Sequence, residues 1–169
     1  MDKETKKQMF KQAREYLSNE EYEKALPLLE ELDKENHAQA QCDLGDMYWS
    51  GQGVEKNLNK ALEYFIKSAK NKYEPAAKSA SKIFRCQWYV LMKERYADNP
   101  ELLKLIGDPV IAPIMEDNSL FVMFLTQSEE EHKPYTQELL DELKEAFERF
   151  YNGRYKVVTG IVTWTAKKA

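Results

Sequence analysis

The sequence predicts an α+β fold in two parts: an array of helical hairpins over residues 1–98 and a small α+β module over residues 99–169. Two observations indicate the helical array. The tripeptide Lys-Ala-Leu occurs twice, 36 residues apart, and the apolar residues around both copies recur at helical spacing. A third observation indicates the module, because residues 120–125 form a continuous apolar run of strand length. The boundary is placed at Asp98-Asn99-Pro100, since a proline ends the preceding helix.

Composition and charge narrow the class of protein. The chain has 169 residues, of which 43% are apolar and 32% charged, as is typical of a globular protein. Its longest apolar run is far shorter than the roughly 20 residues that cross a bilayer, so we expect no membrane partner. Residues 1–98 carry 17 basic and 17 acidic side chains and the rest carry 8 and 12, which argues against a nucleic-acid partner. Two cysteines, Cys42 and Cys86, are most simply reduced thiols, and we expect a cytoplasmic protein.

The repeated unit reads as a helix, a turn and a second helix. Ala40, Leu44 and Tyr48 have helical spacing, and the turn Gly51–Val54 contains two glycines that permit positive φ. Asn57 is placed to cap the second helix. A long helix over residues 75–97 then begins a third unit, with one apolar face made of Ala76, Ala80, Ile83, Phe84, Trp88 and Leu91.

These residues carry a family resemblance. The pattern Ala40-x3-Leu44-Gly45-x2-Tyr48-x2-Gly51-x-Gly53-Val54-x5-Lys60-Ala61 resembles a Sel-1-like repeat, a branch of the tetratricopeptide-like families, over about residues 37–73. The segment before it is similar to a shorter tetratricopeptide unit without the glycine loop. The resemblance therefore implies a tetratricopeptide/Sel-1-like hairpin array over about residues 5–97, and no family is identified for residues 99–169.

The second half alternates helix and strand signals. A short helix over 101–106 precedes an edge strand near Val110–Met115, in which Pro113 cannot donate to a sheet. Residues 120–125 predict a strand buried on both faces. Thr136 is placed to cap a helix that reaches residue 151, and residues 155–165 predict one strand or two short ones. The strand–helix–strand part is predicted as a parallel crossover.

Catalytic and cofactor motifs are absent from the sequence. It contains no Gly-x-Gly-x-x-Gly, phosphate-binding loop, His-Glu-x-x-His or Gly-x-Ser-x-Gly motif. With two histidines and no Cys-x-x-Cys pair, we expect no metal site and no cofactor. Acidic side chains at Asp108, Glu116, Asp117 and residues 129–131 match no calcium loop and are interpreted as solvated.

The resemblance implies a binding face, because the first helix of each tetratricopeptide-like unit lines a concave groove for peptides. By position, the groove residues of this chain are Lys7, Phe10, Arg14, Leu17, Gln39, Cys42, Asp46, Trp49, Lys78, Lys82 and Arg85. Five basic side chains against one acid predict an electropositive face, and Trp49 is of the type that dominates interface energetics. The opposing interpretation is that the basic side chains only solubilise the helices and that the second module covers Trp49.

The sequence thus favours a non-catalytic adaptor that binds a protein or peptide, with an acidic segment or a C-terminal carboxylate as the expected partner. Two alternatives stay open. One is an enzyme or small-ligand module in residues 99–169 that uses the repeats as a docking arm. The other is an immunity-type protein that neutralises its partner by covering it. The sequence carries no signal for an oligomeric state.

Overall fold

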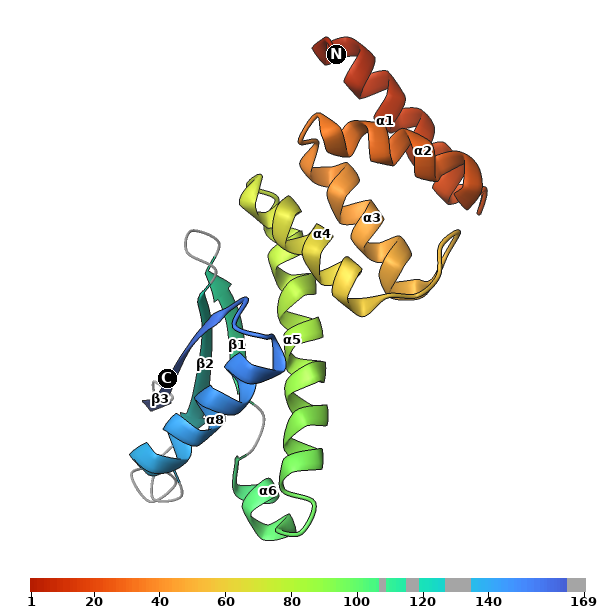
Figure 1. Ribbon diagram of the computed structural model, residues 1–169. Helices are drawn as coiled ribbons and strands as arrows, with labels where there is room; N and C mark the ends of the chain where they lie inside the picture. Colours follow the sequence, from red (N-terminus) through yellow and green to blue (C-terminus); the bar gives the residue numbers. More distant parts are fainter. Residues whose placement is uncertain (107–108, 115–118, 127–134, 164–169) are drawn as a thin grey trace, which may run out of the picture. The chain divides into compact units, whose positions relative to one another are not determined.

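The computed structural model describes residues 1–106, 109–114, 119–126 and 135–163 (Figure 1). Contacts between Cα atoms divide the chain into two compact units, Met1–Ala80 and Ser81–Ala169. The division falls inside one long helix, α5 (Glu74–Arg95), and not after it, where the sequence had placed it. That residues 1–98 and 99–169 are separate domains stays a prediction. Within the described residues, no helix is long and apolar enough to cross a membrane.

The first unit is built from helices that pack in chain order. They are α1 (Lys3–Ser18), α2 (Tyr22–Lys34), α3 (Ala38–Ser50), α4 (Leu58–Lys70) and the start of α5. Helix α1 packs on α2, α2 packs on α3, and α3 packs on α4. The predicted hairpins are therefore present as helix pairs, including the pair that lacks the glycine loop.

Side-chain caps fix where α3 and α4 begin. The Asn57 side chain accepts a hydrogen bond from the backbone N–H of Lys60 at 3.0 Å, as the sequence predicts. The imidazole Nδ1 of His37 accepts from the N–H of Ala40 at 3.2 Å and starts α3. Each cap satisfies a backbone donor that has no partner within its helix.

Small residues let the helices of the first unit approach closely. Its buried cluster consists of Ala13, Ala25, Leu29, Leu32, Ala40, Leu44 and Met47. A Cβ atom added to Gly45 would lie 2.7 Å from the Phe65 ring, so α3 and α4 meet where only glycine fits. Gly53 has φ +70°, and an added Cβ would lie 2.5 Å from the Cβ of Tyr22. The turn thus needs glycine both for its positive φ and for the close approach to Tyr22. Val54, the next residue, packs against the cluster.

The second unit contains the rest of α5, α6 (Pro100–Ile106), β1 (Val110–Ile114), β2 (Ser119–Thr126), α8 (Gln137–Phe150) and β3 (Lys156–Thr163). Thr136 caps α8 as predicted, because its hydroxyl accepts from the N–H of Leu139 at 3.2 Å. Asn99 caps α6 by accepting from the N–H of Leu102. Segment 155–165 forms one strand over its described part, and the acidic run 129–131 lies outside the described residues.

The sheet has the order β1-β2-β3. Strand β1 pairs antiparallel with β2, from Val110 opposite Met123 to Ile114 opposite Ser119. Strand β3 pairs parallel with β2 and starts with Ser119 opposite Lys156, so the predicted parallel crossover through α8 is confirmed. Pro113 lies in an edge strand as expected.

Two sequence predictions about burial need correction. The central strand β2 is not buried on both faces: Leu120, Val122 and Phe124 are buried, whereas Phe121 and Met123 on the opposite face are half-buried. The reason is that α8 packs against the sheet on the side of Val157, and side chains alternate between faces. In α5, Met92 is buried and Leu91 is half-buried, because the inward face continues from residues 84 and 88 at a spacing of four.

Candidate functional site

Two side-chain contacts join α1 to α3 in the first unit. The Arg14 guanidinium lies 2.8 Å from a carboxylate oxygen of Asp43. The rings of Phe10 and His37 have centroids 4.5 Å apart. We call the surface along these contacts the α1–α3 face, defined by Lys7, Phe10, Arg14, Gln39, Asp46 and Trp49. All six were predicted to line the groove, and the face brings residues of two hairpins together.

A cavity of about 710 Å³ lies at the N-terminal end of this face. Three of the predicted residues, Lys7, Phe10 and Gln39, share its lining with His37. Burial lowers the pKa of His37, which favours the neutral imidazole that caps α3. The lining combines lysines and a glutamate with an aromatic ring, a composition that suits a polypeptide rather than a purely apolar ligand. Its residues are Lys3, Glu4, Lys6, Lys7, Phe10, His37 and Gln39.

Asp43 is the residue of this face that the sequence reasoning missed. It is 9% exposed, and burial raises its pKa to about 6 against the opposing effect of the Arg14 guanidinium. One carboxylate oxygen accepts from Arg14, whereas the other, Oδ2, is buried and has no hydrogen-bond partner within the described structure. The signal was present, because Asp43 lies at helical spacing from Ala40 and Met47 on the apolar face of α3.

The pair changes the charge of the face. Arg14 remains 58% exposed at its side chain, so the guanidinium is available to a partner while one edge is held by Asp43. The predicted groove contained five basic side chains and one acidic side chain, Asp46. The α1–α3 face therefore carries an additional buried carboxylate that neutralises much of Arg14 at neutral pH.

Two predicted groove residues face the core instead. Cys42 is 8% exposed, and burial raises its pKa to about 12, with smaller contributions from the carboxylates of Asp46 and Asp43. Leu17 is half-buried and packs against the cluster of the first unit. Cys42 thus offers a partner little surface, and part of Leu17 is used in the packing of the first unit.

Trp49 and Lys78 are accessible to different degrees. Trp49 is half-buried, and its ring meets the ring of Phe65 edge-on with centroids 6.1 Å apart. It therefore supports α4 as well as lining the face. Lys78 is exposed and forms an ion pair with Glu74 at 3.2 Å, one turn earlier in α5. Such exposed pairs exchange easily for a partner's carboxylate, since each contributes less than about 1 kcal/mol.

Lys82 and Arg85, the last two predicted residues, belong to the second unit. Both are exposed on α5. Arg85 lines a shallow depression of about 370 Å³ with Cys86, Tyr89 and Val90. The sequence reasoning had not associated these three neighbours with a site.

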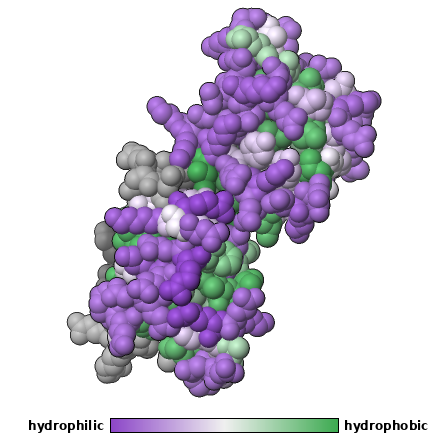
Figure 2. All heavy atoms as spheres, viewed as in Figure 1, coloured by the Kyte–Doolittle hydropathy of each residue, from purple (hydrophilic) through white to green (hydrophobic). Residues whose placement is uncertain are grey.

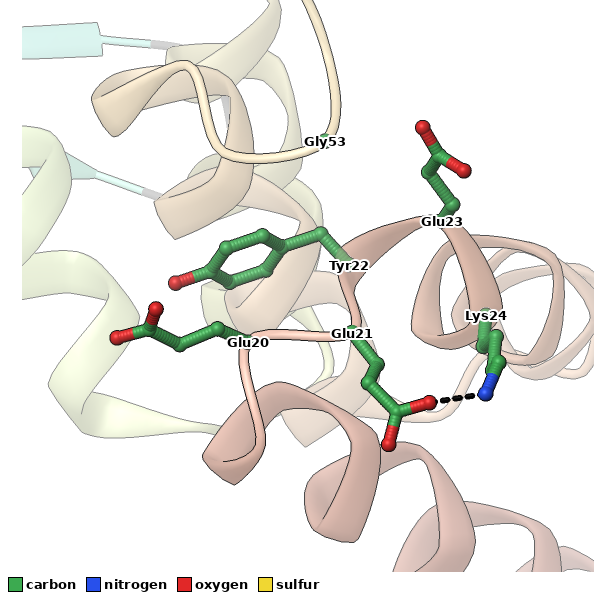
Figure 3. Close-up of a pocket in the computed structure, with 6 residues that line it drawn as sticks. All are labelled: Glu20, Glu21, Tyr22, Glu23, Lys24 and Gly53. Carbon is green, nitrogen blue, oxygen red and sulfur yellow. Dashed lines mark hydrogen bonds and ion pairs between the residues drawn. The ribbon is translucent and has the colours of Figure 1, made fainter.

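A different depression, of about 420 Å³, lies where the glycine turn meets the start of α2 (Figure 3). It is lined by Glu20, Glu21, Tyr22, Glu23, Lys24 and Gly53, and an ion pair joins Glu21 to Lys24. Figure 3 shows the carboxylates of Glu20, Glu21 and Glu23 directed away from one another. They do not converge on a common point. Among the described residues, no group of three or more histidine, cysteine or acidic side chains could hold a metal ion.

The geometry of the first unit is that of a helical-hairpin repeat. Residues 38–73 match the family model for the Sel1 repeat, so this part of the chain is a Sel1-like repeat. These bounds contain α3, the glycine turn and α4. Sel1 repeats are generally protein–protein interaction modules and are typically non-catalytic. In the other comparisons, neither a curated protein nor a solved structure matches the chain.

Proposed function

We propose that this chain is a non-catalytic adaptor that binds a protein or peptide segment through the α1–α3 face of its first unit. The observation that carries the proposal is the Sel1-like repeat at residues 38–73. Its first helix supplies Gln39, Asp46 and Trp49, and α1 supplies the accessible guanidinium of Arg14.

The chemistry of the face favours an acidic partner segment or a free C-terminal carboxylate. Lys7 of this face and Lys78, at the start of α5 in the same unit, are exposed, so each can approach a carboxylate without being moved from a buried position. A guanidinium makes stronger, bidentate contacts than an ammonium group, which gives Arg14 the larger role. Because the contacts are solvent-exposed, binding weakens as the salt concentration rises.

The test is the recovery and cross-linking of partners with a charge variant of the first unit. The variant Lys7→Glu/Lys78→Glu changes two exposed side chains that the core does not use, so its fold is expected to persist. A matched control, Lys24→Glu/Lys34→Glu, introduces the same charge on α2, where each lysine forms a local ion pair with the glutamate three residues earlier. We expect cross-links to α1 and α3 to fall about tenfold in the first variant only, as the loss of two charge-assisted contacts implies.

A second variant addresses the apolar part of the face. Trp49→Ala removes a ring that also contacts Phe65, so circular dichroism is used to show that the protein is folded at the assay temperature. A folded Trp49→Ala protein that keeps the parent's cross-links, together with unchanged binding by the charge variant, would reject the α1–α3 face as the site.

A further inference from the structure

The exposed side of α5 in the second unit carries a surface that the Sel1-like repeat does not include. Six exposed residues lie on it: Lys82, Arg85, Cys86, Tyr89, Val90 and Lys93. At 100° per residue they fall within about 140° of the helix circumference, and we call this surface the α5 stripe. The buried residues of the same helix, Phe84, Trp88 and Met92, lie on another side. The stripe is thus a distinct face and not part of the core.

The centre of the stripe is apolar and unusually exposed. Tyr89 is 53% exposed and Val90 is 51% exposed, more than any other large hydrophobic residue among those described. They are consecutive and border the depression of about 370 Å³ with Arg85 and Cys86. Figure 2 shows hydrophobic residues at the surface along this part of the molecule, with hydrophilic residues around them. Grouped exposure of this kind marks interaction surfaces, whereas single exposed hydrophobic residues are ordinary.

The border of the stripe is basic. Lys82, Arg85 and Lys93 surround the apolar pair, and the Nζ of Lys93 lies 5.9 Å from the centroid of the Tyr89 ring. None of these three forms an ion pair with a carboxylate of the described residues. Glu94 is the only acid in residues 81–95, and its helical position lies beyond the edge of the stripe. An acidic partner therefore meets three cations and no competing carboxylate of this helix.

We infer that the α5 stripe binds an acidic amphipathic helix of a protein partner. The partner's apolar residues contact Tyr89 and Val90, and its carboxylates reach Arg85 and the two lysines. The pattern fits helix recognition, in which side chains three and four residues apart form one anchor line. Residues 99–169 carry 8 basic and 12 acidic side chains, so the second unit offers too little positive charge outside the stripe to favour a phosphate polymer or an anionic membrane. This inference extends the proposed adaptor role and uses a surface that the α1–α3 face does not contain.

The thiol of Cys86 can report whether the α5 stripe is covered. Cys86 is exposed within the stripe, whereas Cys42, the other cysteine, is buried. A bound helix covers Cys86 and slows its alkylation by iodoacetamide, and peptide mass analysis separates the two thiols. The probe is a designed helix of about 20 residues, long enough to hold its conformation, with leucines on one face and glutamates flanking them. The matched peptide has lysine in place of each glutamate.

We expect the glutamate peptide to slow Cys86 alkylation about fivefold at about four times its Kd, when about one fifth of the protein is free. The lysine peptide should not slow it. The variant Tyr89→Ser/Val90→Ser should lose this protection, and Arg85→Glu/Lys93→Glu should lose it and gain protection from the lysine peptide. The control Leu58→Ser changes a hydrophobic residue that is 37% exposed in the first unit, and it should behave like the parent. Each rate is compared with the same protein without peptide, so altered thiol reactivity in a variant does not affect the result.

Three results would overturn the inference. The first is equal protection by both peptides, and the second is full protection in the Tyr89→Ser/Val90→Ser protein. The third is protection by vesicles of phosphatidylserine and phosphatidylcholine but not by the glutamate peptide, which would assign the stripe to a membrane surface. The Trp49→Ala protein should keep the protection of Cys86, so a failure of the α1–α3 face is distinguished from a failure of the stripe.

Discussion

The two units of this protein differ in how many aromatic side chains they bury. The largest buried residues of the second unit are aromatic, and the Trp88 ring lies 5.1 Å from the ring of Phe147 and 5.8 Å from that of Phe124, centroid to centroid. The cluster of the first unit consists of alanine, leucine and methionine, and its helices meet at glycine. Among the described residues of that unit, Phe65 is the one buried aromatic residue. The second unit is therefore most sensitive to atoms that are removed, and the first is most sensitive to atoms that are added.

The largest effect is expected from removing an aromatic side chain in the second unit. Trp88 is 1% exposed, so Trp88→Ala should lower the free energy of unfolding by about 3 to 5 kcal/mol, as for other large aromatic truncations. The next residue provides the control, because Tyr89→Ala at an exposed position should cost less than about 0.5 kcal/mol. Hydrogen exchange followed by mass spectrometry should show the loss of protection in α8 and β2. Equal protection in the two variants would contradict the aromatic core.

The matching experiment in the first unit adds a methyl group. Gly53→Ala places a Cβ 2.5 Å from the Cβ of Tyr22, at a φ of +70°. Two costs should therefore lower the free energy of unfolding: backbone strain of about 1 to 2 kcal/mol and steric overlap of about 1 to 3 kcal/mol. Gly153 has the same φ but nothing within 4 Å of an added Cβ, and Gly153→Ala should cost only the strain. Thermal unfolding of both variants measures the difference. If Gly53→Ala costs no more than Gly153→Ala, the close approach at Tyr22 is wrong.

The stability of the first unit should also depend on pH in a way that the second unit does not share, because the effect arises from Asp43. Its pKa is raised to about 6 by burial, so the folded protein holds this proton where the unfolded chain has released it. The contribution of Asp43 to the free energy of unfolding is therefore at its maximum below about pH 4, and it is lost as the pH rises through about 6. Asp43→Asn removes that loss and should be more stable than the parent by on the order of 2 kcal/mol at pH 7. Urea titrations at pH 4 and pH 7 test this, and a constant difference between the proteins at both values would reject it.

The smallest effects should come from the helix caps, and they should be alike in the two units. Asn57 and Thr136 each accept one backbone hydrogen bond at the start of a helix. Replacing either with alanine should cost about 1 kcal/mol, because one N–H loses its partner. Hydrogen exchange in the first turn of α4 or α8 should increase only in the corresponding variant. A cost below about 0.3 kcal/mol at one site would show that water replaces that cap without loss.

Much of the fold followed from local signals. The caps at Asn57 and Thr136, the glycine turn and the edge position of Pro113 each depend on a few neighbouring residues, so the sequence alone predicted them. The parallel pairing of β2 and β3 followed from the helix between them. The Sel1-like repeat was identified from residues within one hairpin for the same reason.

The features that the sequence missed depend on distant contacts. Asp43 acquires its raised pKa and its Arg14 partner from packing between α1 and α3, 29 residues apart in the chain. The continuous apolar run of β2 predicted burial on both faces, because the residues of a strand do not indicate which face a helix will cover. Tyrosine and valine are also common in protein cores, so their residue types do not show that Tyr89 and Val90 are exposed. Their exposure follows from the packing of α5, which buries the opposite side of the helix.

The parallel pairing of β2 with β3 also constrains synthesis on the ribosome. Ser119 lies opposite Lys156, so a nascent chain must grow by 37 residues after β2 begins before its second neighbour can start to form. At about 5 to 20 residues per second, this takes about 2 to 7 s. During that interval one edge of an apolar strand has no partner from its own chain. Slow decoding of the codons for α8 would prolong this state, so the yield of folded protein should depend on translation speed between residues 127 and 163.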